Sequence, residues 1–341
     1  MRVLVVGAGA LGTVIASKLT NAGIDTVCVD SNAAHAAACR NPGALVELPD
    51  GSTMTTSLQV IASVDQVREP YDYALITLKA PAVPSVVTAL RDSGLVENYV
   101  SLGNGLIQEV IAGVVGAGRL LVGTVSWGAT FIAAGHVRQT TLAPFAVGEW
   151  RYGSNSDRLV RLIDLLSVVA PAHSTDNIVG QVWSKLLLNS SLSGLGTIAG
   201  ADYATAVGTA GGRQLAVGMW TEGLRVAEAM GLSLDEVAGI RPERIDVDGP
   251  GGLSAASKEL DALLEALGAT KASMLQDLER GVPTEVDVIN GAVVSAGADN
   301  DVPTPLNQRC AEIIRQCEKG TVRPGLGNLS FFDDLLSATV E

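Results

Sequence analysis

Residues 2–30 read RVLVVGAGALGTVIASKLTNAGIDTVCVD, and this stretch decides the fold of the N-terminal part of the chain. Arg2–Val6 is a short β-branched apolar run, which predicts a central parallel strand buried on both faces. A helical pattern follows over Thr13–Ala22, Gly23 ends it, and Thr26–Val29 is the next predicted strand. This succession predicts the first βαβ unit of a doubly wound α/β sheet.

The turn between the first strand and the helix carries the spacing G-x-G-x-x-G. Its residues are Gly7, Ala8, Gly9, Ala10, Leu11 and Gly12. The first glycine permits the tight turn, the second lets the backbone approach a pyrophosphate, and the third allows close packing of helix on strand. The helix N-terminus adds free N–H donors and a positive dipole. In this context the turn predicts a Rossmann dinucleotide site, and a glycine-rich turn without a ligand is the alternative.

Asp30 ends the second predicted strand, 30 − 12 = 18 residues after Gly12. A carboxylate at this place accepts hydrogen bonds from the adenosine ribose hydroxyls and repels a 2′-phosphate. The next residues are Ser31 and Asn32, neither of them basic. NAD is therefore favoured over NADP as the cofactor, although Arg40 would reverse this preference if it turned toward the site.

Two further predicted strands end in polar residues. Tyr73–Leu78 leads into Lys79, and Tyr99–Leu102 leads into a loop that places Asn104 between two glycines. Both loops lie at the carboxyl edge of a doubly wound sheet, where ligands bind. Lys79 and Asn104 are therefore candidates for ligand contacts. The alternatives are a solvated lysine and a simple turn asparagine.

The bulk composition bounds the remaining possibilities. A chain of 341 residues with 47% hydrophobic and 17% charged residues suits two folded domains. The net charge of −13 argues against nucleic acid as a partner. Four scattered cysteines and three histidines predict no metal site and suit a reducing cytoplasm. The apolar run after Arg2 is punctuated by Gly7, Gly9 and Gly12, which argues against a signal peptide. The apolar stretch 120–134 is interrupted by glycines and is too short for a membrane span.

The C-terminal half predicts helices. We expect a dinucleotide-binding domain over residues 1–178, closed by a helix over Asp157–Val169, and an all-α domain over residues 179–341. The long helices expected in the second domain are Arg213–Met230, Lys258–Leu267, Lys271–Arg280 and Thr284–Ala298. A homodimer remains open, because no apolar stripe is identifiable as surplus.

One predicted helix, which starts after Gly180, carries candidate chemistry. Lys185, Asn189 and Ser193 are spaced i, i+4 and i+8, so they share one face among leucines. Polar groups in line on an apolar helix favour a cleft over a core. A lysine ammonium can stabilise the alkoxide that forms when a ketone is reduced, and then donate its proton. Glu285 is the candidate acidic partner, although helix capping would also explain it, and a snorkelling surface lysine is the alternative for Lys185.

Six segments, in this order along the chain, resemble the ketopantoate reductase (2-dehydropantoate 2-reductase) family. They are ITLKAP (76–81), SLGNGL (101–106), WSKLLLN (183–189), SMLQD (273–277), TEVDVINGA (284–292) and VPTPLN (302–307). The resemblance implies a Rossmann domain, an all-helical domain and an active site in the cleft between them. It also implies roles for six residues: proton donor for Lys185, acidic partner for Glu285, substrate contacts for Asn189 and Ser273, and positions at the cofactor and the cleft for Lys79 and Asn104.

This sequence departs from the family pattern at three places. Ser31 stands where an arginine commonly holds the NADP phosphate. Ser193 replaces an asparagine one helical turn after Asn189, and a later asparagine corresponds to Tyr203 or Asp202. The predicted catalytic pair is kept, but the residues that recognise the hydroxyls of pantoate are altered. We still expect Ser193 to face the substrate.

The sequence therefore predicts an NAD(P)H-dependent reductase of a small 2-keto acid, with no nucleic-acid or membrane partner. Trp127 and Tyr203 are candidates for an apolar pocket lining, or else core residues. A related dehydrogenase, or a ketone or imine reductase with another substrate, is the first alternative. A non-catalytic NAD-binding sensor is the second, and it would bind cofactor without turnover.

Overall fold

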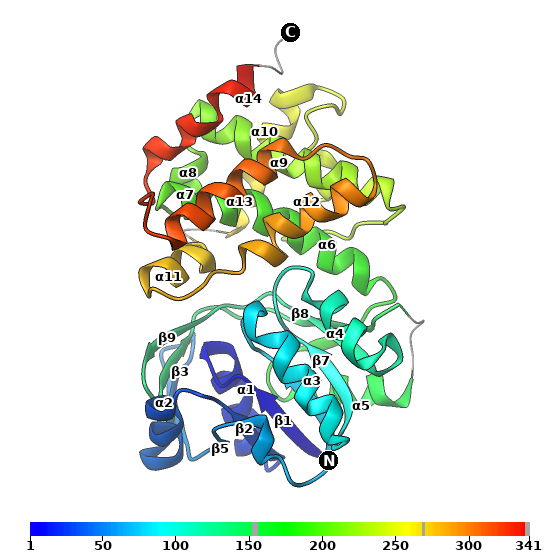
Figure 1. Cartoon of the computed structure of the whole chain (residues 1–341), viewed down its shortest axis with the longest axis vertical. Coiled ribbons are helices and arrows are strands. Elements are labelled where there is room, and N and C mark those ends of the chain that lie inside the picture. The colour runs from blue at the N-terminus through cyan, green and yellow to red at the C-terminus, as the bar shows by residue number, and fades with distance from the viewer. Residues whose placement is uncertain (152–155, 268–269, 338–341) are drawn as a thin grey trace. The chain divides into compact units, whose positions relative to one another are not determined.

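The computed structural model describes residues 1–151, 156–267 and 270–337. The chain divides into two compact units (Figure 1). The first comprises Met1–Gly103 with Ile107–Ile178, and the second comprises Asn104–Leu106 with Val179–Glu341. Both sheets lie in the first unit, and helices build the second. The predicted class, an α/β parallel-sheet domain followed by a helical domain, is confirmed.

An eight-stranded sheet forms the centre of the first unit. Its strands are β1 (Arg2–Val6), β2 (Asp25–Val29), β5 (Gln59–Ile61), β6 (Tyr71–Ile76), β7 (Val96–Ser101), β8 (Leu120–Val125), β11 (Phe145–Glu149) and β12 (Ala172–Ser174). Their order is β12-β11-β8-β7-β6-β1-β2-β5, and every neighbouring pair is parallel except β11 with β8. The chain builds outward from β1 to β5 and then returns to β6, so the strand order reverses between β1 and β6. Ligands bind at the carboxyl ends of such a pair.

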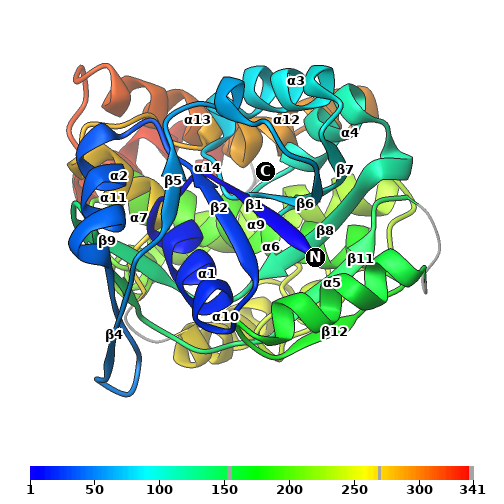
Figure 2. The same ribbon diagram turned by 90° about the horizontal axis from the view of Figure 1, so that it is seen from below.

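Helices cover both faces of this sheet. They are α1 (Ala10–Asn21), α2 (Ala33–Ala38), α3 (Val83–Ser93), α4 (Ile107–Val115) and α5 (Asp157–Ser167). Figure 2 shows α3 and α4 on one face, with α1 and α5 on the other. The buried residues of α5 are leucines at positions 159, 162, 165 and 166, the spacing of a one-faced amphipathic helix. Covered faces explain why the strands are apolar on both sides.

A second, four-stranded sheet has the order β4-β3-β10-β9. Its strands are β3 (Ala44–Glu47), β4 (Thr53–Thr56), β9 (Ala129–Ala133) and β10 (His136–Gln139). It packs against α1. His35 of α2 joins it to the first helix, because its ring contacts Thr13 Oγ1 at 3.1 Å and accepts the Gly135 N–H at 2.9 Å. The sequence pattern alone did not predict this sheet.

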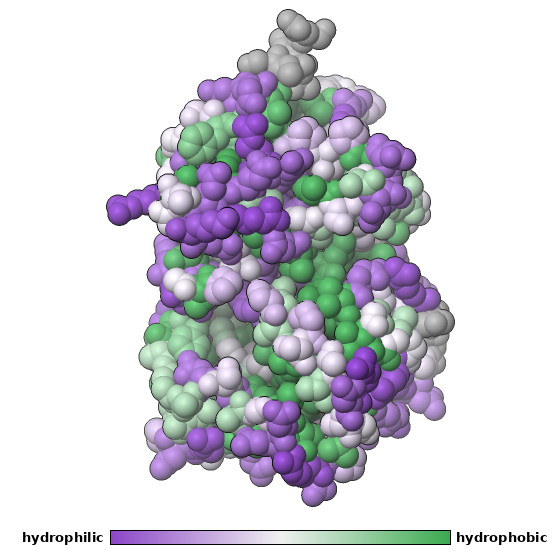
Figure 3. All heavy atoms as spheres, viewed as in Figure 1, coloured by the Kyte–Doolittle hydropathy of each residue, from purple (hydrophilic) through white to green (hydrophobic). Residues whose placement is uncertain are grey.

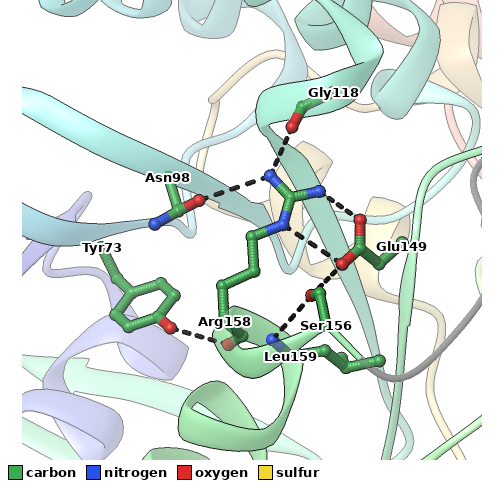
Figure 4. Close-up of polar contacts among 7 residues, drawn as sticks. All are labelled: Tyr73, Asn98, Gly118, Glu149, Ser156, Arg158 and Leu159. Atoms are coloured by element: carbon green, nitrogen blue, oxygen red, sulfur yellow. Dashed lines mark hydrogen bonds and ion pairs between the residues drawn. The ribbon is translucent and has the colours of Figure 1, made fainter.

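An ion pair between the half-buried Arg158 and the buried Glu149 anchors the start of α5 (Figure 4). Arg158 pairs with Glu149 at the end of β11 and donates to Asn98 Oδ1 at 3.4 Å. Tyr73 Oη donates to the carbonyl of Arg158 at 2.7 Å, and Ser156 donates to Glu149. Burial alone would raise the pKa of Glu149, but its hydrogen bonds from Arg158 and Ser156 hold it below the ordinary value. The carboxylate is therefore kept charged where it links helix to sheet.

The second unit is a helical assembly around its own apolar core. Its α-helices are α6 (Ile178–Leu188), α7 (Gly194–Ala199), α8 (Tyr203–Val207), α9 (Ala210–Ala229), α10 (Gly252–Leu267), α11 (Ser273–Glu279), α12 (Asn290–Asp299), α13 (Pro305–Glu318) and α14 (Asp333–Ser337). Hydrophilic side chains cover much of the outer surface of these helices on the face in Figure 3. In the described part of the chain, no helix combines the length and apolarity that a membrane crossing needs.

One helix prediction was wrong. The pattern over Thr284–Ala298 predicts a single helix, but the structure has a 3₁₀ turn at Val286–Val288 and α12 begins only at Asn290. Ile289 breaks the helix with φ −107° and ψ −91°. The break leaves the Val288 carbonyl directed at another segment, where it accepts a backbone N–H at 2.9 Å. This contact is tertiary, so the apolar periodicity of the segment does not reveal it.

Candidate functional site

The glycine-rich turn lies at the carboxyl end of β1. Gly7 has φ +97°, and a Cβ on Gly12 would lie 2.0 Å from the Gly7 carbonyl oxygen, so both positions require glycine. Gly9 is different: it caps α1 at φ −66°, and nothing lies within 4 Å of the place where its Cβ would stand. Open space over an extended backbone at a helix N-terminus suits the close approach of a phosphate group. The other turn residues are Ala8, which is buried, and Ala10 and Leu11, which are half-buried.

Asp30 follows β2 and is half-buried. Its Oδ1 accepts the backbone N–H of Asn32 at 2.8 Å, which fixes the carboxylate beside the end of the strand. Arg40, the residue that would favour a 2′-phosphate, donates from Nη1 to the Val60 carbonyl at 2.8 Å. Lys79 is exposed and directly precedes a 3₁₀ turn after β6. These residues therefore all belong to the unit that carries the glycine-rich turn.

Lys185 and Glu285 lie in the helical unit and interact electrostatically. The lysine is half-buried, and Glu285 is only 3% exposed. Burial lowers the pKa of Lys185 to about 8, and the Glu285 carboxylate acts in the opposite direction. A lysine whose pKa is lowered toward neutral pH, next to a buried carboxylate, has the properties of a proton donor.

Asn104 joins this pair although it follows β7. Its Nδ2 donates to Glu285 Oε2 at 3.3 Å. The segment is held there by its backbone, since the Leu106 N–H donates to the Val288 carbonyl at 2.9 Å. Gly105 allows this approach, because its φ is +68° and a Cβ there would lie 2.1 Å from that carbonyl oxygen. The backbone contact between the loop around Asn104 and the kinked segment before Ile289 thus brings the Asn104 and Glu285 side chains together.

The helix that carries Lys185 does not continue regularly. After Leu188 the chain forms a π-helical turn over Asn189–Ser193 before α7 begins. The expectation of one continuous α-helical face was therefore wrong, because a π turn adds a residue to the local repeat. Asn189 remains half-buried, whereas Ser193 is 1% exposed.

Ser193 faces Tyr203, which opens α8 and is 5% exposed. Burial raises the pKa of the Tyr203 phenol, and the Ser193 hydroxyl partly opposes that rise. Ser193 Oγ lies against the phenol without the geometry of a full hydrogen bond to any described residue. Ser193 is thus in contact with Tyr203, one of the two residues that the sequence offers in place of the later family asparagine. Trp127 is in the first unit, edge-on to Phe145 at 5.9 Å, and packs as a core residue there.

Ser273 opens α11, a helix that packs against the π turn. Ser273 is the first residue of this helix and does not cap it, because Ala272 occupies the N-cap position. Glu285 occupies the N-cap position of the 3₁₀ turn Val286–Val288 but makes no side-chain capping hydrogen bond, so capping does not explain its buried carboxylate. Asn290 lies in the family-like segment TEVDVINGA, but the sequence predicts no role for it. Its amide contacts the π turn at Ser190, and no local sequence signal predicts that contact.

Comparison with known proteins gives two matching family models. The model described as ketopantoate reductase PanE/ApbA matches residues 3–152, and its C-terminal counterpart matches residues 177–318. The curated 2-dehydropantoate 2-reductase of Halobacterium salinarum is 29% identical over 321 residues, covering 94% of this chain and 99% of that protein. The one from Mesorhizobium japonicum is 27% identical over 344 residues, covering 93% and 97%.

Solved structures show the same fold. The ternary structure of D-mandelate dehydrogenase with NADH and anilino(oxo)acetate has a TM-score of 0.79 at 22% identity, covering 94% of this chain and 99% of that one. A PanE/ApbA family ketopantoate reductase from Ralstonia eutropha has a TM-score of 0.78, also at 22% identity and with the same coverage. The two family models match both parts of the chain in one order, and this protein therefore belongs to the ketopantoate reductase PanE/ApbA family of NAD(P)-dependent oxidoreductases.

Proposed function

We propose that this protein uses NADH to reduce a 2-keto acid, with Lys185 as the proton donor. The observation that carries the proposal is the lysine of lowered pKa, about 8, beside a carboxylate that is 3% exposed. An ordinary surface lysine holds its proton too tightly for efficient donation near neutral pH, since donors work best when their pKa lies near the operating pH.

The chain's own groups divide the work between them. When bound, the reduced nicotinamide supplies a hydride to the carbonyl carbon. The Lys185 ammonium stabilises the charge that develops on the carbonyl oxygen and then transfers a proton to it. Glu285 orients the ammonium and keeps it largely protonated at pH 7. Asn104 holds this carboxylate through the hydrogen bond that its Nδ2 donates to Oε2. Asn189 and Ser273 are the proposed substrate contacts.

The glycine-rich turn fits the dinucleotide. Open space over Gly9 and the free N–H groups of the α1 N-terminus would hold the pyrophosphate. Asp30 would accept hydrogen bonds from the ribose, and its negative charge disfavours a 2′-phosphate. Arg40 already donates to a backbone carbonyl, which supports the preference for NADH. Lys79 completes the proposed cofactor set.

The substrate we infer is a 2-keto acid with an apolar side chain. Ser193 and Tyr203 take the places where the family commonly has asparagines, and their hydroxyls are turned toward each other in a buried contact. A serine hydroxyl and a phenol each have one donor hydrogen, whereas an amide has two, so this pair has less capacity to bind a distal substrate hydroxyl than two asparagines. Removal of that recognition favours a substrate without the hydroxyl.

The test is a matched pair of substrates, ketopantoate and 3,3-dimethyl-2-oxobutanoate, which differ only by one hydroxyl group. We expect kcat/KM to be higher for the second acid, and higher by about tenfold for NADH than for NADPH, a difference of about 1.4 kcal/mol. Lys185→Ala should lower kcat by about 100-fold to 10,000-fold and leave the Kd for NADH unchanged.

Other results have definite meanings. Better turnover of ketopantoate would refute the substrate class, and better use of NADPH would refute the assignment of Asp30. NADH binding without turnover of any keto acid, with no effect of Lys185→Ala on any measured property, would support a cofactor-binding sensor instead. Turnover only with an added amine would point to imine reduction.

A further inference from the structure

The π-helical turn Asn189–Ser193 interrupts the helix directly after Lys185. Such turns break the regular backbone ladder and occur frequently at functional sites. Here a side chain from elsewhere contacts the turn. Asn290, the first residue of α12, donates from Nδ2 to the Ser190 carbonyl at 2.8 Å. The irregular backbone is thus held by an amide from a segment 100 residues later.

The Asn290 amide is itself fixed in orientation. It is fully buried, and its Nδ2 also donates to Asn307 Oδ1 at 3.1 Å. The opposite orientation would place its carbonyl oxygen against two other carbonyl oxygens, so only one rotamer satisfies both contacts. The Asn290 Oδ1 atom has no hydrogen-bond partner among the described residues. Its Nδ2 contacts therefore define its position.

Asn307 is oriented by a buried carboxylate. Its Nδ2 donates to Glu222 Oε2 at 2.8 Å and to the Met219 carbonyl at 3.0 Å, which turns its Oδ1 toward Asn290. Glu222 is 5% exposed and accepts two more donors, the backbone N–H groups of Leu306 at 2.7 Å and Asn307 at 2.9 Å. All three of these partners donate, so Glu222 acts only as an acceptor.

This carboxylate also replaces a missing helix cap. Thr304, the N-cap residue of α13, provides no side-chain hydrogen bond to the first turn. Glu222 of α9 satisfies two of the open N–H groups instead and adds a negative charge at the helix N-terminus. Burial raises the pKa of Glu222, and the hydrogen bonds from Asn307 and Leu306 oppose that rise. The donors around Glu222, together with the Met219 carbonyl, set the direction of the hydrogen bonds from Glu222 to Ser190.

Packing provides an independent observation at the same place. Gly194 follows the π turn and begins α7. A Cβ at Gly194 would lie 3.2 Å from Asn290 Nδ2, 3.3 Å from its Oδ1 and 2.9 Å from Cys310 Sγ. The backbone after the turn therefore rests against the same amide that binds it. Hydrogen bonding and close packing both converge on Asn290.

We propose that Glu222, Asn307 and Asn290 form a chain of positioning residues that holds the π turn, and with it Asn189, in register with Lys185. They touch neither substrate nor cofactor in this proposal and act through the backbone at Ser190. The inference rests on the proposed function only for its kinetic consequence. Its structural part concerns the π turn alone and is measurable without turnover.

The test compares Asn290→Ala and Glu222→Gln with the wild-type protein by hydrogen exchange and kinetics. In both variants, amides of a peptide covering residues 188–196 should exchange about tenfold faster or more, because the turn opens locally. The kcat/KM for the keto acid should fall by up to about 100-fold, the cost of a small misplacement of a substrate contact. The Kd for NADH should stay unchanged, since the glycine-rich turn lies in the other unit.

Asn300→Ala is the matched control. Asn300 lies at the opposite end of α12, and its Nδ2 donates to the Ala296 carbonyl at 2.8 Å, so its loss removes one comparable hydrogen bond. It should leave exchange at residues 188–196 and the KM for the keto acid unchanged. Unaltered exchange there in Asn290→Ala, or an equal increase in Asn300→Ala, would overturn the proposal. Glu222→Gln keeps the side-chain shape if Asn290→Ala does not fold.

Failure of the two proposals can be told apart. If the wild-type protein turns over no keto acid but exchange at the π turn changes as expected, the proposed function fails and the positioning chain stands. If the wild-type protein is active and exchange at the turn does not change, the positioning chain fails alone.

Discussion

Replacing Glu285 by glutamine tests the electrostatic basis of proton donation. Burial lowers the pKa of Lys185 to about 8 despite the opposing effect of Glu285. A glutamine keeps an oxygen that can accept the Asn104 Nδ2 hydrogen bond but removes the negative charge. A neighbouring carboxylate typically raises a lysine pKa by about one unit or more, so we expect the Lys185 pKa to fall to about 7 or below. One unit corresponds to about 1.4 kcal/mol.

The assay is the pH dependence of kcat/KM, which reports ionisations of the free enzyme. Activity requires the protonated lysine, so it falls as pH rises through the pKa. At pH 8 the protonated fraction should drop from about one half in the wild-type protein to about one tenth in Glu285→Gln. The control is Asp287→Asn, which removes an exposed carboxylate paired with Arg315. An alkaline limb that stays in place, moves upward, or moves equally in the control would refute the reasoning.

Three further predictions concern binding, stability and reactivity. Gly9→Ala should weaken NADH binding about tenfold or more without lowering Tm, because the added Cβ enters space that is open in the protein alone. The control Gly113→Ala also places its Cβ in open space, but within α4, and should leave NADH binding unchanged. Equal Kd values for NADH in the Gly9→Ala variant and the wild-type protein would contradict this prediction. Arg158→Met should cost about 3–5 kcal/mol at pH 7 in urea unfolding, because Glu149 is left buried and charged. The ionised Glu149 stabilises the folded protein above the pKa of the unfolded chain, and this stabilisation is lost as pH falls through the lowered folded pKa. The difference in unfolding free energy between wild type and Arg158→Met should therefore shrink in acid. A difference that stays constant with pH would argue against the ion pair. All four cysteines are buried, and burial raises the pKa of each thiol. None should react with a thiol reagent at pH 8 until the protein is unfolded in urea. Rapid labelling of the native protein would disprove their burial.

The first βαβ unit was predictable because its signals are local. β-branched residues, a glycine turn and an acidic strand end lie within 30 residues, and each has one structural meaning in that order. The observed elements β1, α1 and β2 begin and end within a few residues of the predicted ones. The small sheet was not predicted, because its strand β10 pairs with β3 and the paired residues His136 and Leu45 are 136 − 45 = 91 positions apart in the chain.

The candidate site likewise has residues that the sequence indicates and contacts that only the tertiary structure shows. The sequence indicated Lys185 and Glu285 through their spacing and family segments, and their contact with Asn104 depends on a backbone bond from Leu106 to Val288. The prediction of one helix over Thr284–Ala298 was wrong, because the local residue pattern contains no information about that long-range hydrogen bond. The face expected for Asn189 and Ser193 was altered by the π turn for a similar reason.

The sequence by itself determined the fold class and the glycine-rich turn, because propensity, glycine geometry and helical periodicity act over a few residues. It also indicated Lys185 as the proposed proton donor, through its helical spacing and the family resemblance. Only the tertiary structure decided the lowered pKa of Lys185, the π turn beneath Asn189 and the orientation of Asn290 by Glu222. Burial, charge and hydrogen-bond direction depend on which distant groups meet in space, and that information is absent from any local stretch of the chain.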